Sequence, residues 1–190
     1  DTDDTDDTDD TDDTDDTDAG TTVADVQSGT IAEGTTVTLN GVLATTGISL
    51  NVNDAGFFIQ DKGGGEYSGV YVYVGSLLVS DLEPGYELSV TGEVTEYYDL
   101  TEIAVADSAD VVVTGAGSVT KSGLSEAPSD WESYEGTLLT LSNVTVTADS
   151  DTYGEATTDW AAPTDKDTAG VLTIDDMFYS HNSMDGTVYQ

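Results

Sequence analysis

Short runs of β-branched and aromatic residues are the feature that most limits how this chain can fold. Each run is bounded by glycine, asparagine, aspartate or proline, and five of them lie at residues 36–43, 56–60, 70–74, 86–94 and 111–114. Runs of this length and composition are typical of strands joined by turns. Apart from a weak pattern at residues 125–133, no stretch of a dozen residues has the apolar spacing of an amphipathic helix. The sequence therefore predicts an all-β protein in which these five strands form a small barrel.

The first 18 residues repeat the triplet Asp-Thr-Asp six times and contain no apolar side chain. Such a segment has nothing to bury, so we expect it to stay solvated outside any fold. Its period of three matches the three residues per turn of polyproline II, and repulsion between the carboxylates favours an extended chain. Residues 1–20 are therefore interpreted as an acidic tail, acting as a tether or as a plain linker.

Acidic residues greatly outnumber basic ones, with 39 Asp and Glu against 3 Lys and Arg, for a net charge of −36. Phosphate binding typically needs about 6 to 10 cationic contacts, so nucleic acid is not expected as a partner. The absence of cysteine excludes disulfides, thiolate metal sites and cysteine nucleophiles. There is also no apolar run of about 18 residues, so no transmembrane segment is expected.

A segment in the second half of the chain repeats one in the first half. Residues 33–42 (EGTTVTLNGV) align with residues 135–144 (EGTLLTLSNV) at a constant offset of 102. The two segments share Glu, Gly, two Thr, Leu and Val. Chance rarely produces this agreement over ten positions, so we interpret the chain as two copies of one module.

The alignment continues beyond this repeat and predicts where the second copy stops. Residues 58–61 align with residues 173–176, and the turn at 84–85 aligns with the turn at 185–186. On this alignment the second copy ends at Gln190, inside its fourth strand, and has no fifth strand. We therefore expect the second barrel to be incomplete.

Three longer segments resemble a known family: residues 26–42 (VQSGTIAEGTTVTLNGV), 56–73 (GFFIQDKGGGEYSGVYVY) and 84–103 (PGYELSVTGEVTEYYDLTEI). They resemble the extracellular OB-fold modules of secreted bacterial nucleases. They are equally similar to modules of bacterial surface lipoproteins, which often stand in tandem behind Asp/Thr-rich linkers. The second half of the chain is similar to the companion module of such arrays.

This resemblance implies tandem OB-like five-stranded β-barrels, the first in residues 21–115 and the second, incomplete, in residues 116–190. It also implies an extracellular or cell-surface-anchored protein. In the nucleases catalysis belongs to a separate metal-dependent domain, and no motif of that kind occurs here. His181 is the only histidine, and its SHNSMDG segment lacks the strand and helix that flank a nucleophile elbow. We therefore expect no enzyme activity.

Tyrosines offer one candidate ligand-binding surface. Tyr67, Tyr71 and Tyr73 share one parity along the expected third strand, with Tyr97 and Tyr98 at the end of the next. Cross-strand packing in a barrel wall accounts for such residues, and stacking on a neutral glycan is the alternative. Under that alternative the protein is a glycan- or substrate-binding appendage of a secreted hydrolase such as a nuclease.

Calcium is the cofactor that the sequence favours, because it binds oxygen ligands and is abundant outside cells. Asp149, Asp151 and Glu155 form one candidate set of metal ligands, and Asp175 and Asp176 form another. The loop at residues 149–155 does not have the complete spacing of an EF-hand. Solvated turn aspartates are the alternative interpretation.

The incomplete second barrel leads to the main functional hypothesis. An unclosed barrel leaves backbone groups unpaired at a sheet edge. Either the chain continues past Gln190, or another subunit adds a strand, with residues 21–27 or the acidic tail as candidate donors. Head-to-tail donation generates a filament. The sequence thus favours a non-catalytic structural or adhesive surface protein that self-associates through exposed strand edges, assisted by calcium.

Overall fold

The computed structural model describes residues 20–49, 55–77, 79, 82–148, 156–163 and 170–174. Strands predominate in this part of the chain, so the all-β prediction is confirmed for it. Its helices are short: α1 (Val23–Gln27) and the 3₁₀ helices η1 (Ser108–Asp110) and η2 (Glu132–Tyr134). None of the described helices has the length and apolarity that a bilayer-spanning helix needs.

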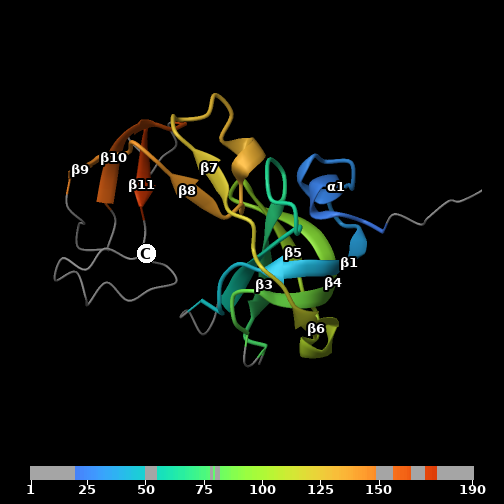
Figure 1. The fold of residues 1–190 in the computed structure, drawn as a ribbon. Coiled ribbons are helices and arrows are strands. Elements are labelled where there is room, and N and C mark those ends of the chain that lie inside the picture. The colour runs from blue at the N-terminus through green and yellow to red at the C-terminus, as the bar shows by residue number, and fades with distance from the viewer. Residues whose placement is uncertain are drawn as a thin grey trace, which may run out of the picture.

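The main sheet contains six strands: β1 (Thr36–Ala44), β2 (Ala55–Gln60), β3 (Gly69–Gly75), β4 (Tyr86–Tyr97), β5 (Leu100–Ala104) and β6 (Val111–Ala116). Their order is β1-β2-β3-β5-β4-β6, and β1 also pairs with β4. That additional pairing closes β1, β2, β3, β5 and β4 into a ring, which Figure 1 shows at the centre of the molecule. Neighbouring strands are antiparallel except β3 and β5, which are parallel.

Four of the five strands predicted from the sequence belong to this ring, but the fifth does not. The predicted fifth strand is β6, which lies outside the ring on β4, and β5 takes its expected place. β5 follows β4 through a two-residue turn at Tyr98 and Asp99, whose φ values are 51° and 62°. Turns with two positive φ values usually contain Asn-Gly or Asp-Gly, so the sequence Tyr-Asp gave no hairpin signal.

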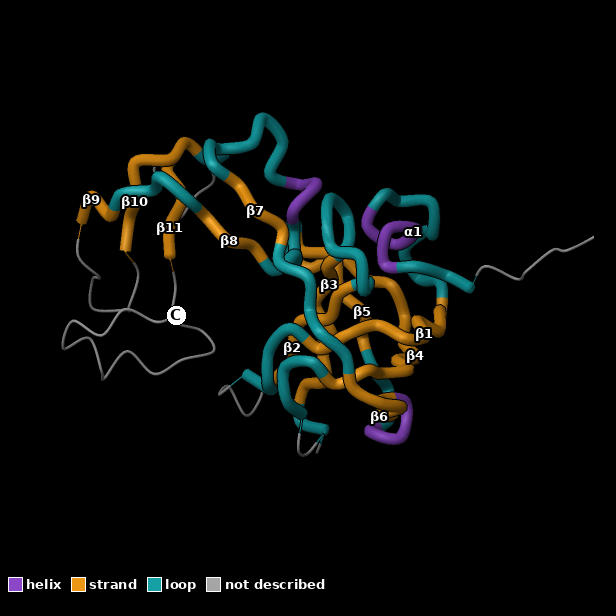
Figure 2. Tube along the Cα trace, viewed as in Figure 1, coloured by secondary structure: helices purple, strands orange, loops and turns teal. Residues whose placement is uncertain are grey.

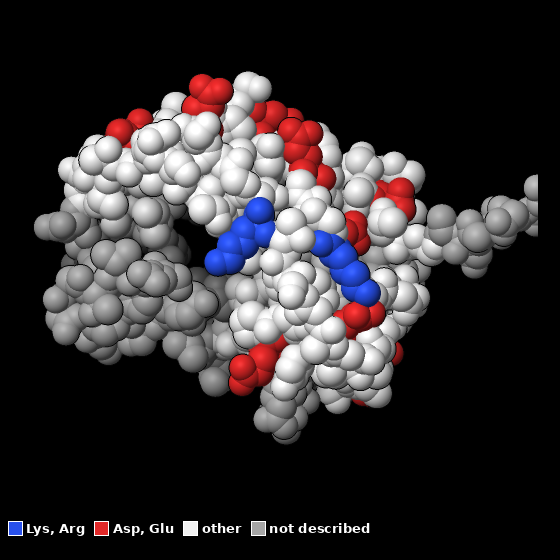
Figure 3. Space-filling model, in the orientation of Figure 1, with Lys and Arg blue, Asp and Glu red and all other residues white. Residues whose placement is uncertain are grey.

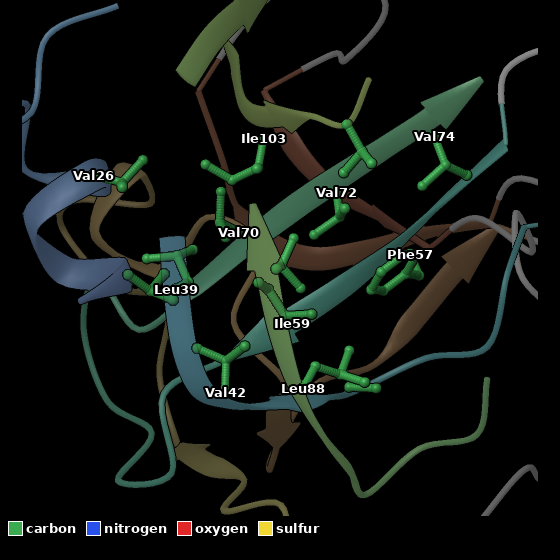
Figure 4. Close-up of a cluster of buried hydrophobic side chains, with 14 of the residues drawn as sticks. Val26, Leu39, Val42, Phe57, Ile59, Val70, Val72, Val74, Leu88 and Ile103 are labelled. Carbon is green, nitrogen blue, oxygen red and sulfur yellow. The ribbon is translucent and has the colours of Figure 1, made fainter. Parts of the chain in front are cut away.

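The core lies inside the ring and is made by alternate residues of its strands (Figure 4). On β3, Val70, Val72 and Val74 point inward and are buried. They meet Phe57 and Ile59 of β2, which are also buried. Burial of such side chains contributes about 1.5 to 3 kcal/mol each, so this alternation accounts for the closed sheet.

α1 adds two valines to the same core. Val23 and Val26 are buried in it, and Thr22 caps the helix by accepting a hydrogen bond from the Asp25 N–H at 3.1 Å. The Asp61 carboxylate, just after β2, accepts a hydrogen bond from the Val23 N–H at 3.4 Å. Residues 21–27 are a candidate donor strand in the sequence, but in the structure residues 23–27 form a helix whose valines lie in the core of the ring.

Five further strands form the second module: β7 (Ser122–Leu124), β8 (Leu139–Leu141), β9 (Val146–Ala148), β10 (Ala156–Ala161) and β11 (Val171–Ile174). β7 and β8 are parallel, while β9, β10 and β11 form an antiparallel sheet with β10 in the middle. Figure 2 shows this module beside the ring. Among the residues that the structure describes, the second module contains no closed ring of strands.

Hydrogen bonds join the start of the second module to the ring. The Gln60 side chain is buried, donates to the Thr120 carbonyl at 2.6 Å and accepts from the Leu138 N–H at 3.0 Å. The backbones of Gly69 and Gly136 approach so closely that a side chain on Gly69 would overlap Gly136. The predicted domain boundary near residue 116 therefore lies close in sequence to the hydrogen bonds that join the second module to the ring.

Candidate functional site

The two segments of the internal repeat have the same backbone conformation at both of their left-handed positions. Gly34 and Gly136, which are 102 residues apart, have φ values of 81° and 64°. Gly41 and Asn143, at the same offset, have φ values of 71° and 61°. Asparagine is among the few non-glycine residues that adopt this region readily. β8, the kink at Asn143 and β9 therefore correspond to β1 with its bulge at Gly41.

The next two strands also keep the same order in both copies. Ala44 of β1 pairs with Ile59 of β2, and the equivalent Val146 of β9 pairs with Thr158 of β10. β3 then pairs with β2 as β11 pairs with β10. This order makes β11 the third strand of its copy, whereas the alignment of residues 173–176 predicted the second. The sequence of β10, ATTDWA, has too little apolar character to be recognised as a strand.

In the first copy, one edge of β1 is covered by β4. The Val94 N–H donates to the Thr35 carbonyl at 2.9 Å. Because hydrogen-bonding residues alternate in an antiparallel pair, Val37 and Leu39 direct their backbone groups toward β4 as well. The residues of β8 equivalent to these two are Leu139 and Leu141.

In the second copy, no described strand covers the equivalent edge of β8. β8 pairs with β7 through its other edge: the Leu138 carbonyl accepts from the Ser122 N–H at 3.0 Å, and the Ser142 N–H donates to Leu124 at 2.8 Å. The intervening Leu139 and Leu141 therefore direct their backbone groups away from β7. No other described strand pairs with β8. We call the backbone groups of Leu139 and Leu141 the β8 edge.

The side chains beside the β8 edge are less well covered than their counterparts in the ring. Leu139, Leu141 and Val144 are only partly buried. Their equivalents Val37, Leu39 and Val42 are buried in the core of the first copy. Within the described residues, the backbone groups of the β8 edge have no strand partner, and the apolar side chains beside them are incompletely covered.

β6 is another edge strand, since it pairs only with β4 among the described strands, and β7, β9 and β11 lie at the edges of their sheets as well. Val112 and Val113 of this strand are 48% and 50% exposed. Residues 111–120 contain no charge, and neither do residues 136–148 around β8 and β9. Edge strands of soluble proteins usually carry charges that prevent pairing with other chains. Neither β6 nor β8 has that protection, although the chain has 39 acidic residues.

The three predicted ligand-binding tyrosines occupy different environments. Tyr67 lies before β3, in a turn, with a φ of 58°. Tyr71 is only 4% exposed, because its ring lies over Gly56 and packs edge-on against Phe58 with centroids 5.0 Å apart. Tyr73 shares the outer face of β3 with Tyr71 and is partly buried. The geometry of Tyr71 is that of cross-strand packing.

Among the described residues, the most exposed aromatic side chains are instead at the tip of the β4–β5 hairpin. Tyr97 is 62% exposed and Tyr98 is 81% exposed. Their rings are nearly perpendicular, at 87°, with centroids 4.6 Å apart. The sequence placed both tyrosines at a strand end, but their turn geometry depends on the unpredicted strand β5.

All five predicted calcium ligands lie outside the described residues: Asp149, Asp151, Glu155, Asp175 and Asp176. The same holds for His181. Within the described ranges, no group of three or more histidines or carboxylates is arranged to hold a metal ion.

Two half-buried carboxyl groups have structural contacts. Burial raises the pKa of Asp61 and of Glu135 above their usual values. Asp61 bonds to the first turn of α1, and Glu135 accepts a hydrogen bond from the Thr101 N–H at 3.1 Å. These carboxylates thus attach α1 and the segment before β8 to the ring.

Few basic side chains appear on the face shown in Figure 3. Acidic residues are spread around this face, and the few basic side chains lie near its middle. Lys62 forms an ion pair with Glu87 at 2.9 Å, so a neighbouring carboxylate offsets its positive charge. This distribution offers little attraction for a phosphate backbone.

In comparisons with known proteins, no family model, no curated protein and no solved structure matches this chain. The functional interpretation therefore rests on the strands and side chains described above. Among these, the edge strands of the described sheets, β6 and β8 included, present unpaired backbone groups that a strand of another chain can bind.

Proposed function

We propose that this chain is a non-catalytic structural or adhesive module that acts outside the cell and self-associates through open sheet edges. The observation that supports this function is the pair of uncharged edges on β6 and β8. An unprotected edge strand is a template for a strand from another chain. Assembly by such contacts needs no catalytic group.

The strand order supports an OB-type barrel as the unit of this assembly. OB barrels have five strands in a partly open Greek-key arrangement, and the ring here also has five. The second copy has equivalents of the first three strands. The resemblance of the chain to surface modules that stand behind Asp/Thr-rich linkers supports an extracellular or cell-surface location.

Calcium belongs to the proposal because of the charge of the chain. A net charge of −36 causes repulsion between molecules of this protein, and a divalent cation bound by carboxylates lowers that repulsion. The acidic residues at 149–155 and 175–176 are the proposed ligands. Assembly is therefore expected to be stronger with calcium than with a chelator.

The test is the size of the particles that the purified protein forms. Sedimentation velocity and negative-stain electron microscopy are compared at about 1 mM calcium, at which weak extracellular sites fill, and with chelator. We expect concentration-dependent oligomers or filaments, more abundant with calcium. A monomer at all concentrations in both conditions would contradict the proposed function.

A second candidate function is favoured by the exposed pair Tyr97 and Tyr98. Two exposed aromatic rings on a hairpin tip can stack on a neutral glycan, so the chain would then be the binding appendage of a secreted hydrolase. Titration with a glycan panel, followed by tyrosine fluorescence, tests this function. Quenching that is lost in Tyr98→Ala supports it, and no quenching across the panel argues against it.

A further inference from the structure

We propose that the β8 edge of one molecule accepts β6 of a second molecule as an antiparallel strand, so that molecules join head to tail. This inference rests on the proposed function and names the two surfaces through which it operates.

The first copy of the internal repeat, in which β4 pairs with β1, provides the template for the accepting edge. β4 lies along β1 in antiparallel register and contributes Leu88 and Val90 to the core. The segment that contains the β8 edge repeats the positive φ values of the β1 segment, with Gly136 and Asn143 at the positions of Gly34 and Gly41. A strand added there takes the position of β4 and covers the partly buried Leu139.

β6 fits this position without leaving its own sheet. One of its edges is paired with β4, and the other has no described strand beside it. Its sequence VVVTGA is β-branched at four of six positions and carries no charge. Pairing with β8 would join two existing sheets edge to edge, so neither partner needs to unfold.

Two segments near the N-terminus fit less well as donors. The helix α1 already uses its valines in the core of the ring. The Asp-Thr-Asp tail would bring carboxylates against a chain whose net charge is already −36. In contrast, residues 111–120 and 136–148 bring no charge to the contact.

The positions of the two edges determine the form of the assembly. Figure 1 shows β6 at the lower end of the ring and the second module at the upper left, so the edges are different surfaces. A contact between different surfaces is heterologous, and it leaves one free edge at each end of a dimer. Repetition of this contact produces an open chain of molecules wherever the rotation between neighbours does not close a ring.

The internal repeat supplies a matched pair of variants for the test. Thr140 on β8 and Thr38 on β1 are equivalent, and both are exposed. Thr140→Lys places a charge on the proposed contact strand, whereas Thr38→Lys adds the same charge to a strand whose edge is already paired with β4. We expect Thr140→Lys to weaken self-association at least about tenfold, since an unpaired charge at an edge opposes pairing. Thr38→Lys should retain association near the level of the unmodified protein.

A crosslinking experiment tests the pairing of β6 with β8 directly. The chain has no cysteine, so Val112→Cys on β6 and Thr140→Cys on β8 introduce the only thiols. Oxidation of the double variant should give a ladder of covalent oligomers, with neighbouring positions on each strand scanned for register. Each single variant should give at most a dimer. Disulfides need Cα atoms within about 7 Å, so a ladder reports close strand contact.

The outcomes separate this inference from the proposed function. Assembly that is lost in Thr140→Lys and in Val112→Lys, but not in Thr38→Lys, supports the β6–β8 contact. Assembly that persists in both edge variants overturns this contact and leaves self-association standing. A protein that remains monomeric at high salt and with calcium overturns both.

Discussion

At the scale of single residues, Gln60 has the most consequential polar contacts. It is fully buried between the ring and the second module, where it satisfies the Thr120 carbonyl and the Leu138 N–H. Gln60→Leu keeps a similar volume but leaves both backbone groups without these partners. Each unsatisfied buried group costs about 1 to 3 kcal/mol, so we expect a loss of at least about 2 kcal/mol. Urea unfolding measures it, and a loss below about 0.5 kcal/mol would contradict the predicted role.

Gly56 gives a second prediction at this scale. A Cβ there would overlap the Tyr71 hydroxyl and come within 2.6 Å of the Val72 carbonyl oxygen. We expect Gly56→Ala to destabilise the fold by about 1 to 3 kcal/mol, as overpacking does. Gly63→Ala is the matched control, because nothing lies within 4 Å of its added Cβ. Equal thermal midpoints for the two variants would show that Tyr71 does not pack as described.

At the scale of elements, the attachment of α1 to the ring predicts a dependence of stability on pH. The pKa of Asp61 is raised in the folded protein by burial, and that of Glu135 is raised for the same main reason. The folded state therefore binds protons at higher pH than the unfolded state. Stability from these groups is present below their unfolded pKa values and is lost as pH rises through the folded values.

We therefore expect the thermal midpoint to rise when pH is lowered from neutral toward about 4.5, near the usual pKa of these carboxyls. Asp61→Asn keeps an oxygen that accepts the Val23 N–H but does not titrate, so it should flatten this dependence. Circular dichroism melts at a series of pH values measure both effects. A midpoint that falls throughout this range, or an unchanged slope in Asp61→Asn, would contradict the assignment. Asp25 and Asp159 have lowered pKa values and should affect stability only at more acidic pH.

At the scale of the whole molecule, charge controls how closely two molecules approach. The net charge of −36 repels approaching copies, while residues 111–120 and 136–148 are neutral. The Debye length falls from about 30 Å at 0.01 M salt to about 10 Å at 0.1 M, so added salt should increase association. Sedimentation velocity across this range measures the change. Association that weakens as salt increases would indicate that ion pairs hold the contact, rather than uncharged strand edges.

Some properties were determined by the sequence alone, because they depend on neighbours along the chain. Alternation of residues such as Val70, Val72 and Val74 predicts a strand wherever one face is buried. The repeated Glu-Gly-Thr of residues 33–35 and 135–137 revealed two related segments before their backbones could be compared. The acidic composition likewise argued against nucleic-acid binding without any coordinates.

Only the tertiary structure decided the strand pairing and the edges. β5 joins the ring through β3 and through a Tyr98-Asp99 turn with no glycine, so its local sequence gave little sign of it. α1, at five residues, is too short for a periodic pattern and depends on capping by Thr22 and on burial. Whether β6 or β8 is an edge depends on which distant strands lie beside it. Pairing is set by contacts between residues far apart in the chain, so local patterns could predict the strands but not the surfaces that we propose to join.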